Sequence, residues 1–85
     1  MTYEMAKAIL SRQSRSLRAI RDVRVFHGGY EYRVDYWGGF GAYIAIDRRV
    51  VGKRKFRFFG GVSGAYCHDA EEAMGLVMDK IEGRV

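Results

Sequence analysis

The spacing of hydrophobic residues changes along the chain from helical to alternating and then back to helical. Six apolar residues within positions 3–21 fall on one side of a helix: Met5, Ala6, Ile9, Leu10, Leu17 and Ile20. From position 23 to position 59 apolar and polar residues alternate, which is typical of half-buried strands. Positions 70–81 return to helical spacing after Asp69, which has Glu72 three residues later in the manner of a capping box. The pattern predicts an α+β fold of order α-β-β-β-β-α: an antiparallel sheet of three to four strands with an N-terminal and a C-terminal helix.

The first glycine pair predicts a tight hairpin. Gly28-Gly29 can supply the positive φ angles of a two-residue turn between two alternating segments. Such a turn pairs His27 with Tyr30, Val25 with Tyr32 and Val23 with Val34. Apolar residues then oppose apolar ones on one face of the sheet. We therefore expect that face, with three of the tyrosines, to pack against the core: Tyr30, Tyr32 and Tyr36.

Two further turns are expected to extend the sheet. The glycine-rich turn at 38–41 leads into a third strand, and an odd loop length opposes Tyr36 to Ala42, Val34 to Ile44 and Tyr32 to Ile46. We expect this register because it keeps both isoleucines on the core face. Gly52-Lys53 then turns the chain into a fourth strand at 54–59, and residues 60–68 are expected to form a loop before the C-terminal helix.

Charge is distributed unevenly along this pattern. The net charge of +5 divides into +8 over residues 1–68 (thirteen cations, five acids) and −3 over residues 69–85 (two cations, five acids). A basic majority in one part of a chain favours an anionic partner, most commonly nucleic acid. No acid occurs between positions 5 and 21 or between positions 48 and 57. These two basic segments are therefore the candidates for such a contact.

The second basic segment is the strongest candidate site. It contains six cations: Arg48, Arg49, Lys53, Arg54, Lys55 and Arg57. A hairpin that gathers them supplies the closely spaced positive charge that a phosphate backbone attracts. Three arginines on the polar side of the N-terminal helix are expected to extend this patch: Arg12, Arg15 and Arg18. The alternative is a solvated hairpin whose cations maintain solubility and protect an edge strand from pairing.

Aromatic residues outside the core are a second kind of candidate contact. Trp37, Phe40 and Phe59 are expected on the outer face of the sheet or in loops. In these places an aromatic ring can stack on the bases of a nucleic acid. It can equally serve as the anchor of a protein interface.

No motif for catalysis, a cofactor or a metal stands out. The glycine-rich segment 60–64 lacks the Lys-Ser/Thr of a phosphate-binding loop, and the helix after it begins with acids that repel phosphate. Cys67 and the two histidines fall short of a zinc ligand set, and no third group is evident to orient a Cys-His nucleophile. We therefore expect a protein that is not an enzyme and has no cofactor, metal site or small-molecule substrate.

The bulk properties add constraints on the class of protein. Eighty-five residues are expected to form one small basic domain spanning positions 1–85. A single cysteine excludes an intrachain disulfide, which is consistent with a cytoplasmic location. No apolar run approaches the roughly 20 residues of a membrane span, so we expect no membrane partner.

Two families share the order of the predicted elements. The chain resembles double-stranded RNA-binding domains in one segment that leads into a basic strand and then a helix: Ile44-Ala45-Ile46-Asp47-Arg48-Arg49-Val50-Val51-Gly52. It differs from them at residues 68–72, where the acids of the second helix replace the family's lysine cluster. Over residues 30–81 the chain also looks like the three-stranded DNA-reading sheets of arm-type recombinase domains and plant ethylene-response factors. In the latter the last strand leads into a Glu-Ala helix, as at Glu71-Glu72-Ala73.

These observations lead to two hypotheses about function. The first is a small, non-enzymatic nucleic-acid-binding protein that grips DNA or RNA through the basic hairpin and the N-terminal helix. The second is a compact inhibitor or regulator of a host protein complex, of the kind that phages use against CRISPR effectors or polymerases. Like charges along the predicted edge strand oppose self-pairing, so we expect a monomer when the protein is free.

Overall fold

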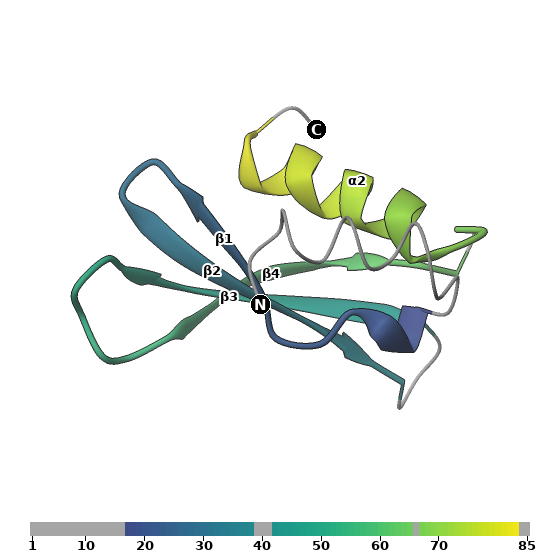
Figure 1. Cartoon of the computed structure of the whole chain (residues 1–85), viewed down its shortest axis with the longest axis horizontal. Helices are drawn as coiled ribbons and strands as arrows, with labels where there is room; N and C mark the ends of the chain where they lie inside the picture. The colour runs from purple at the N-terminus through teal and green to yellow at the C-terminus, as the bar shows by residue number, and fades with distance from the viewer. Residues whose placement is uncertain (1–16, 39–41, 66, 84–85) are drawn as a thin grey trace.

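The computed structural model describes residues 17–38, 42–65 and 67–83 (Figure 1). Its elements are a 3-10 turn, four strands and one helix: η1 (Leu17–Ala19), β1 (Val23–His27), β2 (Tyr30–Trp37), β3 (Tyr43–Val50), β4 (Arg57–Ser63) and α2 (Ala70–Ile81). The predicted antiparallel sheet and C-terminal helix are confirmed. The predicted N-terminal helix at 3–21 is not shown, because positions 1–16 lie outside the described residues and positions 17–19 form only the turn η1.

The chain leaves helical geometry before position 21 because it already lies against the sheet there. The carbonyl of Ile20 accepts a hydrogen bond from the backbone N–H of Tyr36 at 2.8 Å, and the backbone N–H of Asp22 donates to Asp35 Oδ1 at 2.8 Å. Asp22 has a φ angle of 48°, which redirects the chain into β1. Hydrogen bonds to β2 thus take the place of the intrahelical bonds that a helix through Arg21 would need.

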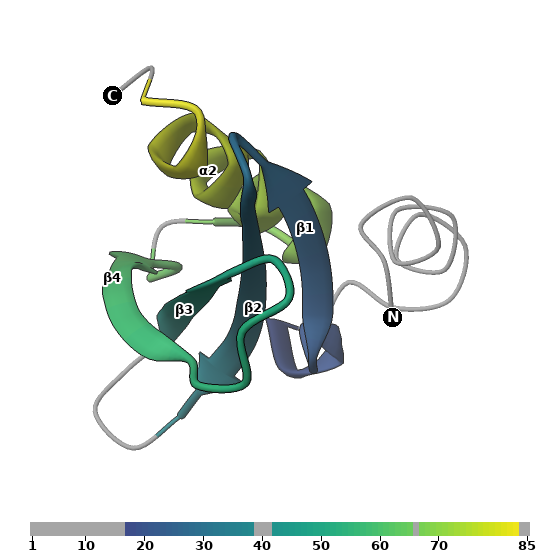
Figure 2. The same ribbon diagram turned by 90° about the vertical axis from the view of Figure 1, so that its left-hand side faces the viewer.

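The four strands form one antiparallel sheet in the order β1-β2-β3-β4. Helix α2 lies across one face of this sheet, and the opposite face, which we call the open face, has no described helix over it (Figure 2). The fully or largely buried side chains come from alternate positions of β1, β2 and β3 and from one side of α2 and its neighbours: Ile20, Val23, Val25, Tyr32, Val34, Ile44, Ile46, Ala70, Ala73, Met74, Val77 and Ile81. The core therefore sits between the sheet and α2.

Helix α2 begins and ends as its sequence predicts. Asp69 Oδ1 accepts a hydrogen bond from the backbone N–H of Glu72 at 2.9 Å, and Glu72 Oε2 accepts one from the backbone N–H of His68 at 3.1 Å. Two unpaired N–H groups at the start of the helix are thereby satisfied. Gly83 ends the helix with a φ angle of 73°, which glycine adopts without strain. Neither described helix is long and apolar enough to cross a membrane.

The first hairpin has the predicted register, but the second is displaced from it by two residues. Val34 pairs with Ile46 and Tyr36 with Ile44, so the isoleucines still face the core. The predicted register would have opposed Glu31 to Asp47, two like charges at neighbouring positions. The observed register instead opposes Glu31 to Arg49 and Arg33 to Asp47. Electrostatic pairing on the open face thus accounts for a choice that the hydrophobic pattern does not determine.

Strand β4 begins three residues later than predicted and extends to Ser63. Residues 60–63, expected in a loop, are strand, because Gly60 and Gly61 leave room for neighbouring side chains. A Cβ atom at Gly61 would collide with the Tyr43 ring, and one at Gly60 would meet Lys80 Cε at 2.6 Å. An irregularity opposite Ile46 and Asp47 places an extra residue, Phe59, in β4.

The position expected for Phe59 is therefore wrong. Its half-buried ring packs edge-on against Tyr32, with ring centroids 5.2 Å apart, and belongs to the core side of the sheet. Of the two consecutive phenylalanines, Phe58 is the exposed one, with an exposed fraction of 67%. The β-bulge turns Phe59 inward, which simple alternation along the strand does not anticipate.

Candidate functional site

A carboxylate held between two arginines lies on the open face, near the turn between β1 and β2. Glu31 on β2 is only 9% exposed. Arg24 on β1 donates to Glu31 Oε2 at 2.6 Å, and Arg49 on β3 donates to Glu31 Oε1 at 2.8 Å. Burial acts to raise the pKa of the Glu31 carboxyl, but the hydrogen bonds from Arg24 and Arg49 outweigh it and hold this pKa below its ordinary value.

The other acids of the open face also lie beside arginines. Arg24 contacts Asp22 at 2.6 Å, and this hydrogen bond lowers the pKa of the Asp22 carboxyl. Arg33 reaches Asp47 at 3.1 Å and Asp35 at 3.9 Å. The charges of the open face therefore form connected ion pairs, in which Arg24, Glu31 and Arg33 each contact two partners of opposite charge.

The ring of Phe56 covers these ion pairs. Three guanidinium carbons lie over it, at 4.3 Å for Arg33, 4.5 Å for Arg49 and 5.2 Å for Arg24. Phe56 ends the segment 51–56 that joins β3 to β4, which we call the hairpin loop. Cation–π attraction is stronger where the cation is shielded from water. The ring thus ties the hairpin loop to the open face.

Backbone contacts hold the rest of the hairpin loop. The N–H of Val51 donates to the carbonyl of Gly29 at 3.1 Å, and the N–H of Lys53 donates to the carbonyl of Val50 at 2.9 Å. Arg49 also donates to the carbonyl of Arg54, at 3.4 Å. Gly52 has a φ angle of 92°, a conformation that other residues rarely adopt. The loop is thus connected to β2, to β3 and to the turn between β1 and β2.

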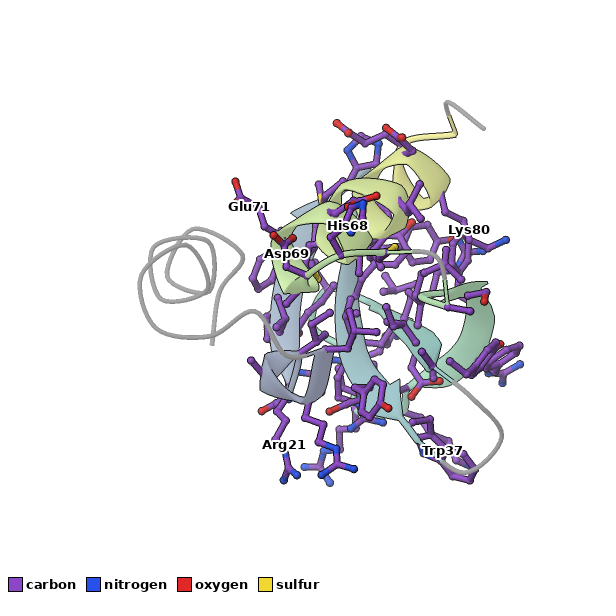
Figure 3. The ribbon with its side chains drawn as sticks, turned by 90° about the vertical axis from the view of Figure 1, so that its right-hand side faces the viewer. Arg21, Trp37, His68, Asp69, Glu71 and Lys80 are labelled. Atoms are coloured by element: carbon purple, nitrogen blue, oxygen red, sulfur yellow. The ribbon has the colours of Figure 1, made fainter. Side chains whose placement is uncertain are left out.

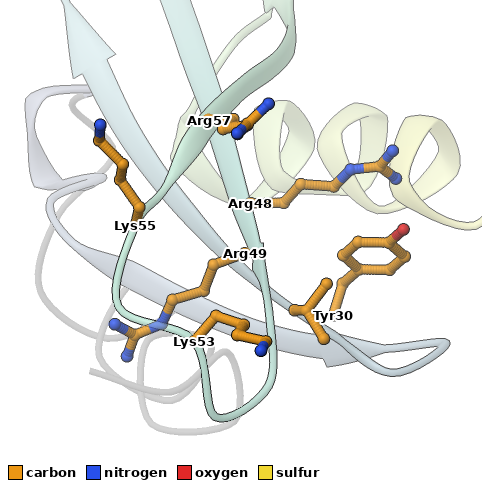
Figure 4. Close-up of a pocket in the computed structure, with 7 residues that line it drawn as sticks. Tyr30, Arg48, Arg49, Lys53, Lys55 and Arg57 are labelled. Atoms are coloured by element: carbon orange, nitrogen blue, oxygen red, sulfur yellow. The ribbon is translucent and has the colours of Figure 1, made fainter.

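Beside this loop lies an open hollow of about 460 Å³ (Figure 4). Its lining contains five cations and no acid: Tyr30, Arg48, Arg49, Val50, Lys53, Lys55 and Arg57. The guanidinium of Arg48 lies between two rings, 4.2 Å from the centroid of Tyr30 and 4.7 Å from that of Phe59. In Figure 4, Arg48 extends alongside Tyr30, whereas Arg49 and Lys55 extend to the other side of the hairpin. An anion entering the hollow would meet positive charge on both sides.

The structure separates the six predicted cations into two groups. Arg49 is paired with Glu31, and Arg48 is enclosed by aromatic rings. The other four are exposed, and no carboxylate among the described residues forms an ion pair with them: Lys53, Arg54, Lys55 and Arg57. We call these four residues the exposed cations. They form one patch along the hairpin loop and the first residue of β4.

The remaining predicted contacts are placed elsewhere or lie outside the described residues. Arg18 is exposed on η1, beside the Trp37 end of β2, whereas the hairpin loop lies near the Tyr30 end. The structure therefore does not bring Arg18 to the hairpin loop. Trp37 is 63% exposed on the open face. Arg12, Arg15 and Phe40 lie outside the described residues.

Sequence reasoning missed the role of Phe56. The fourth strand predicted at 54–59 includes both Phe56 and Phe58, but only Phe58 belongs to β4. The charge pattern of the strands could have indicated this role. Glu31 and Arg33 fall on one face of β2, with Arg24 on the strand to one side and Arg49 on the strand to the other. A cluster of guanidinium groups on one face is a surface to which an aromatic ring can bind.

The described residues contain no group of three or more His, Cys, Asp or Glu side chains that could hold a metal ion. Cys67 is half-buried before α2, and burial raises the pKa of its thiol. A raised thiol pKa lowers the fraction of reactive thiolate.

We also compared the chain with known proteins. No protein-family model matches the chain, and neither a curated protein nor a solved structure matches it.

The ion pairs of Glu31 predict a specific dependence of stability on pH. Because the pKa of Glu31 is lowered on folding, its stabilisation is complete above the ordinary value of 4.5 and is lost as the pH falls through the lower folded value. Glu31→Gln should reduce the free energy of unfolding by about 1–3 kcal/mol at neutral pH and reduce its loss on acidification. Urea unfolding at several pH values measures both. The exposed Glu71→Gln is the matched control, and an equal acid response in all three proteins would contradict this account.

The contacts of Phe56 predict a contrast between two neighbouring phenylalanines. Phe56→Ala removes a ring from three guanidinium groups and should lower the free energy of unfolding by about 1–3 kcal/mol. Phe58→Ala removes an exposed ring and should change it by less than about 0.5 kcal/mol. Chemical denaturation of both variants measures the difference. Equal effects would show that Phe56 does not hold the hairpin loop to the open face.

Proposed function

We propose that this chain is a small, non-enzymatic nucleic-acid-binding protein that grips the phosphate backbone through the hairpin loop and the start of β4. The observation that carries the proposal is the patch of exposed cations at the rim of an acid-free hollow. Isolated surface cations are common, but four of them on one tethered segment form a concentrated positive surface. Such surfaces attract polyanions.

Tethering of the hairpin loop matters for binding. A flexible basic loop must lose conformational freedom when it binds a polyanion, which weakens the complex. Phe56 and the backbone bonds of Val51 and Lys53 already hold this loop in place. Much of that ordering is therefore complete before the ligand arrives.

The six cations at positions 48–57 have different roles in this proposal. The exposed cations contact phosphates. Arg49 holds the loop through Glu31 and Arg54, and Arg48 forms one wall of the hollow beside Tyr30. Binding through phosphates carries little sequence information by itself, so the preference for a particular base sequence should be modest.

Salt dependence tests this proposal. Binding to duplex DNA should weaken with salt with a slope of about −0.9 per neutralised phosphate, or about −0.7 on a single strand. The double variant Lys53→Gln/Lys55→Gln removes two exposed cations and should reduce the slope by about two units. Lys80→Gln, on α2 outside the hairpin, is the control for loss of a single charge elsewhere and should leave the slope nearly unchanged. Fluorescence anisotropy with labelled oligonucleotides over a salt series gives these slopes.

Two results would reject the nucleic-acid proposal. One is the absence of measurable binding to any duplex or single strand at low salt. The other is an equal loss of affinity per removed charge for the hairpin double variant and for Lys80→Gln, which would indicate that only the total charge matters.

The second candidate, an inhibitor of a host protein complex, is favoured by the exposure of Trp37. Tryptophan is enriched among the anchors of protein interfaces, and truncation of such an anchor weakens a complex by about 2 kcal/mol or more. If this proposal holds, nuclease-treated protein should form a stable complex with one protein assembly, and Trp37→Ala should abolish it. Loss of all binding after nuclease treatment would instead support the nucleic-acid proposal.

A further inference from the structure

Three exposed aromatic side chains lie on the open face, on the side nearest β4. Trp37 ends β2, Tyr43 begins β3 and Phe58 lies in β4, with exposed fractions of 63%, 37% and 67%. Trp37 pairs with Tyr43 across two strands, and Phe58 pairs with Asp47. Strand alternation therefore puts all three on the face opposite α2. We call these three residues the aromatic strip.

Small residues form the floor between these rings. Ala45 of β3 pairs with Gly61 of β4, and the ring of Tyr43 leans over Gly61, where a Cβ atom would collide with it. The Tyr43 ring thus lies one row of the sheet from Phe58, a separation of roughly 7 Å along the strands. Trp37 lies directly across from Tyr43, at roughly 5 Å between Cβ atoms. The three positions thus follow one another across the open face, with Trp37 beside Tyr43 and Phe58 further along β4, past the row of Ala45 and Gly61.

The charges around the strip favour an anionic chain. The nearest acids, Asp35 and Asp47, are both paired with Arg33, so their repulsion of an anion is reduced. Arg57 precedes Phe58 but pairs with Arg48, so strand alternation directs it to the other face. Lys55, three residues before Phe58, is one of the exposed cations and extends to the same side of the hairpin as Arg49 of the open face (Figure 4). At the other end, the bond between Tyr36 and Ile20 brings Arg21 to the same edge of the molecule as Trp37 (Figure 3). Positive charge thus lies at both ends of the aromatic strip.

We propose that the aromatic strip is a stacking surface for the bases of single-stranded nucleic acid. The inference rests on the proposed function, because the exposed cations hold the phosphates of the same strand. In a duplex the faces of each base are covered by its neighbours, whereas an unpaired base can place its face on an aromatic ring. The protein should therefore prefer single strands to duplexes, with little discrimination among bases.

The test compares three ligands of equal length. They are a single-stranded oligonucleotide, prepared as DNA and as RNA, an abasic strand with the same sugar-phosphate backbone, and a duplex. Anisotropy gives the affinities, and the fluorescence of Trp37, the only tryptophan of the chain, reports directly on stacking. We expect the base-carrying strand to bind most tightly and to quench Trp37, and the abasic strand to bind more weakly without quenching.

Two leucine variants separate aromatic stacking from general hydrophobic contact. Phe58→Leu removes a ring from the strip and should weaken single-strand binding roughly 5- to 100-fold, as expected for the loss of a base–ring stack. It should leave binding of the abasic strand unchanged. Phe26→Leu is the matched control, because Phe26 is 60% exposed on the same face but on β1, at the opposite edge. Its effect should stay within about twofold.

The outcomes distinguish this inference from the function on which it rests. Equal affinity for the base-carrying and abasic strands, tighter binding of the duplex, or equal effects of Phe58→Leu and Phe26→Leu would overturn the stacking surface and leave phosphate binding intact. Absence of binding to every ligand would reject both. Circular dichroism of each variant confirms that the comparison is made on folded protein.

Discussion

The burial of Glu31 between two arginines is the constraint on which the arrangement of the sheet depends. A carboxylate that is nearly removed from water must be paired with cations and hydrogen-bonded, or it destabilises the fold. Glu31 lies on β2, and its partners lie on the strands to either side, Arg24 on β1 and Arg49 on β3. Satisfying one side chain therefore aligns three strands. The same arginines then form the surface that receives Phe56, and Phe56 positions the hairpin loop with its exposed cations.

This constraint explains which parts of the fold could be predicted from the sequence. Alternation of apolar residues identifies the core face of each strand, and the Gly28-Gly29 turn determines the first register. In the second hairpin a shift of two residues leaves the same side chains facing the core, so hydrophobicity cannot distinguish the two registers. The charges can: only the observed register opposes Glu31 to Arg49 and Arg33 to Asp47. The charges of the polar face therefore contain the information that selects the second register.

Other differences have causes that a residue pattern does not reveal. The end of β4 contains two adjacent glycines, which usually indicate a turn, but here Tyr43 and Lys80 occupy the space that a side chain would fill. The bulge at Phe59 then reverses which of two consecutive phenylalanines faces the core. The helix after the loop was predicted correctly because its signals are local: Asp69 and Glu72 at the start and Gly83 at the end.

Cations that are close together in the sequence can have different roles in the fold. Counted along the chain, the six cations at 48–57 look equivalent. In the fold, a cation opposite a carboxylate or between aromatic rings stabilises the protein, and only one without such a partner can exchange its counterions for phosphates. Arg48 and Arg49 belong to the first kind because β2 places Glu31, Tyr30 and Tyr32 beside them. The salt dependence of binding should therefore reflect about four charges at this hairpin rather than six, since counterion release counts only the cations that phosphates replace.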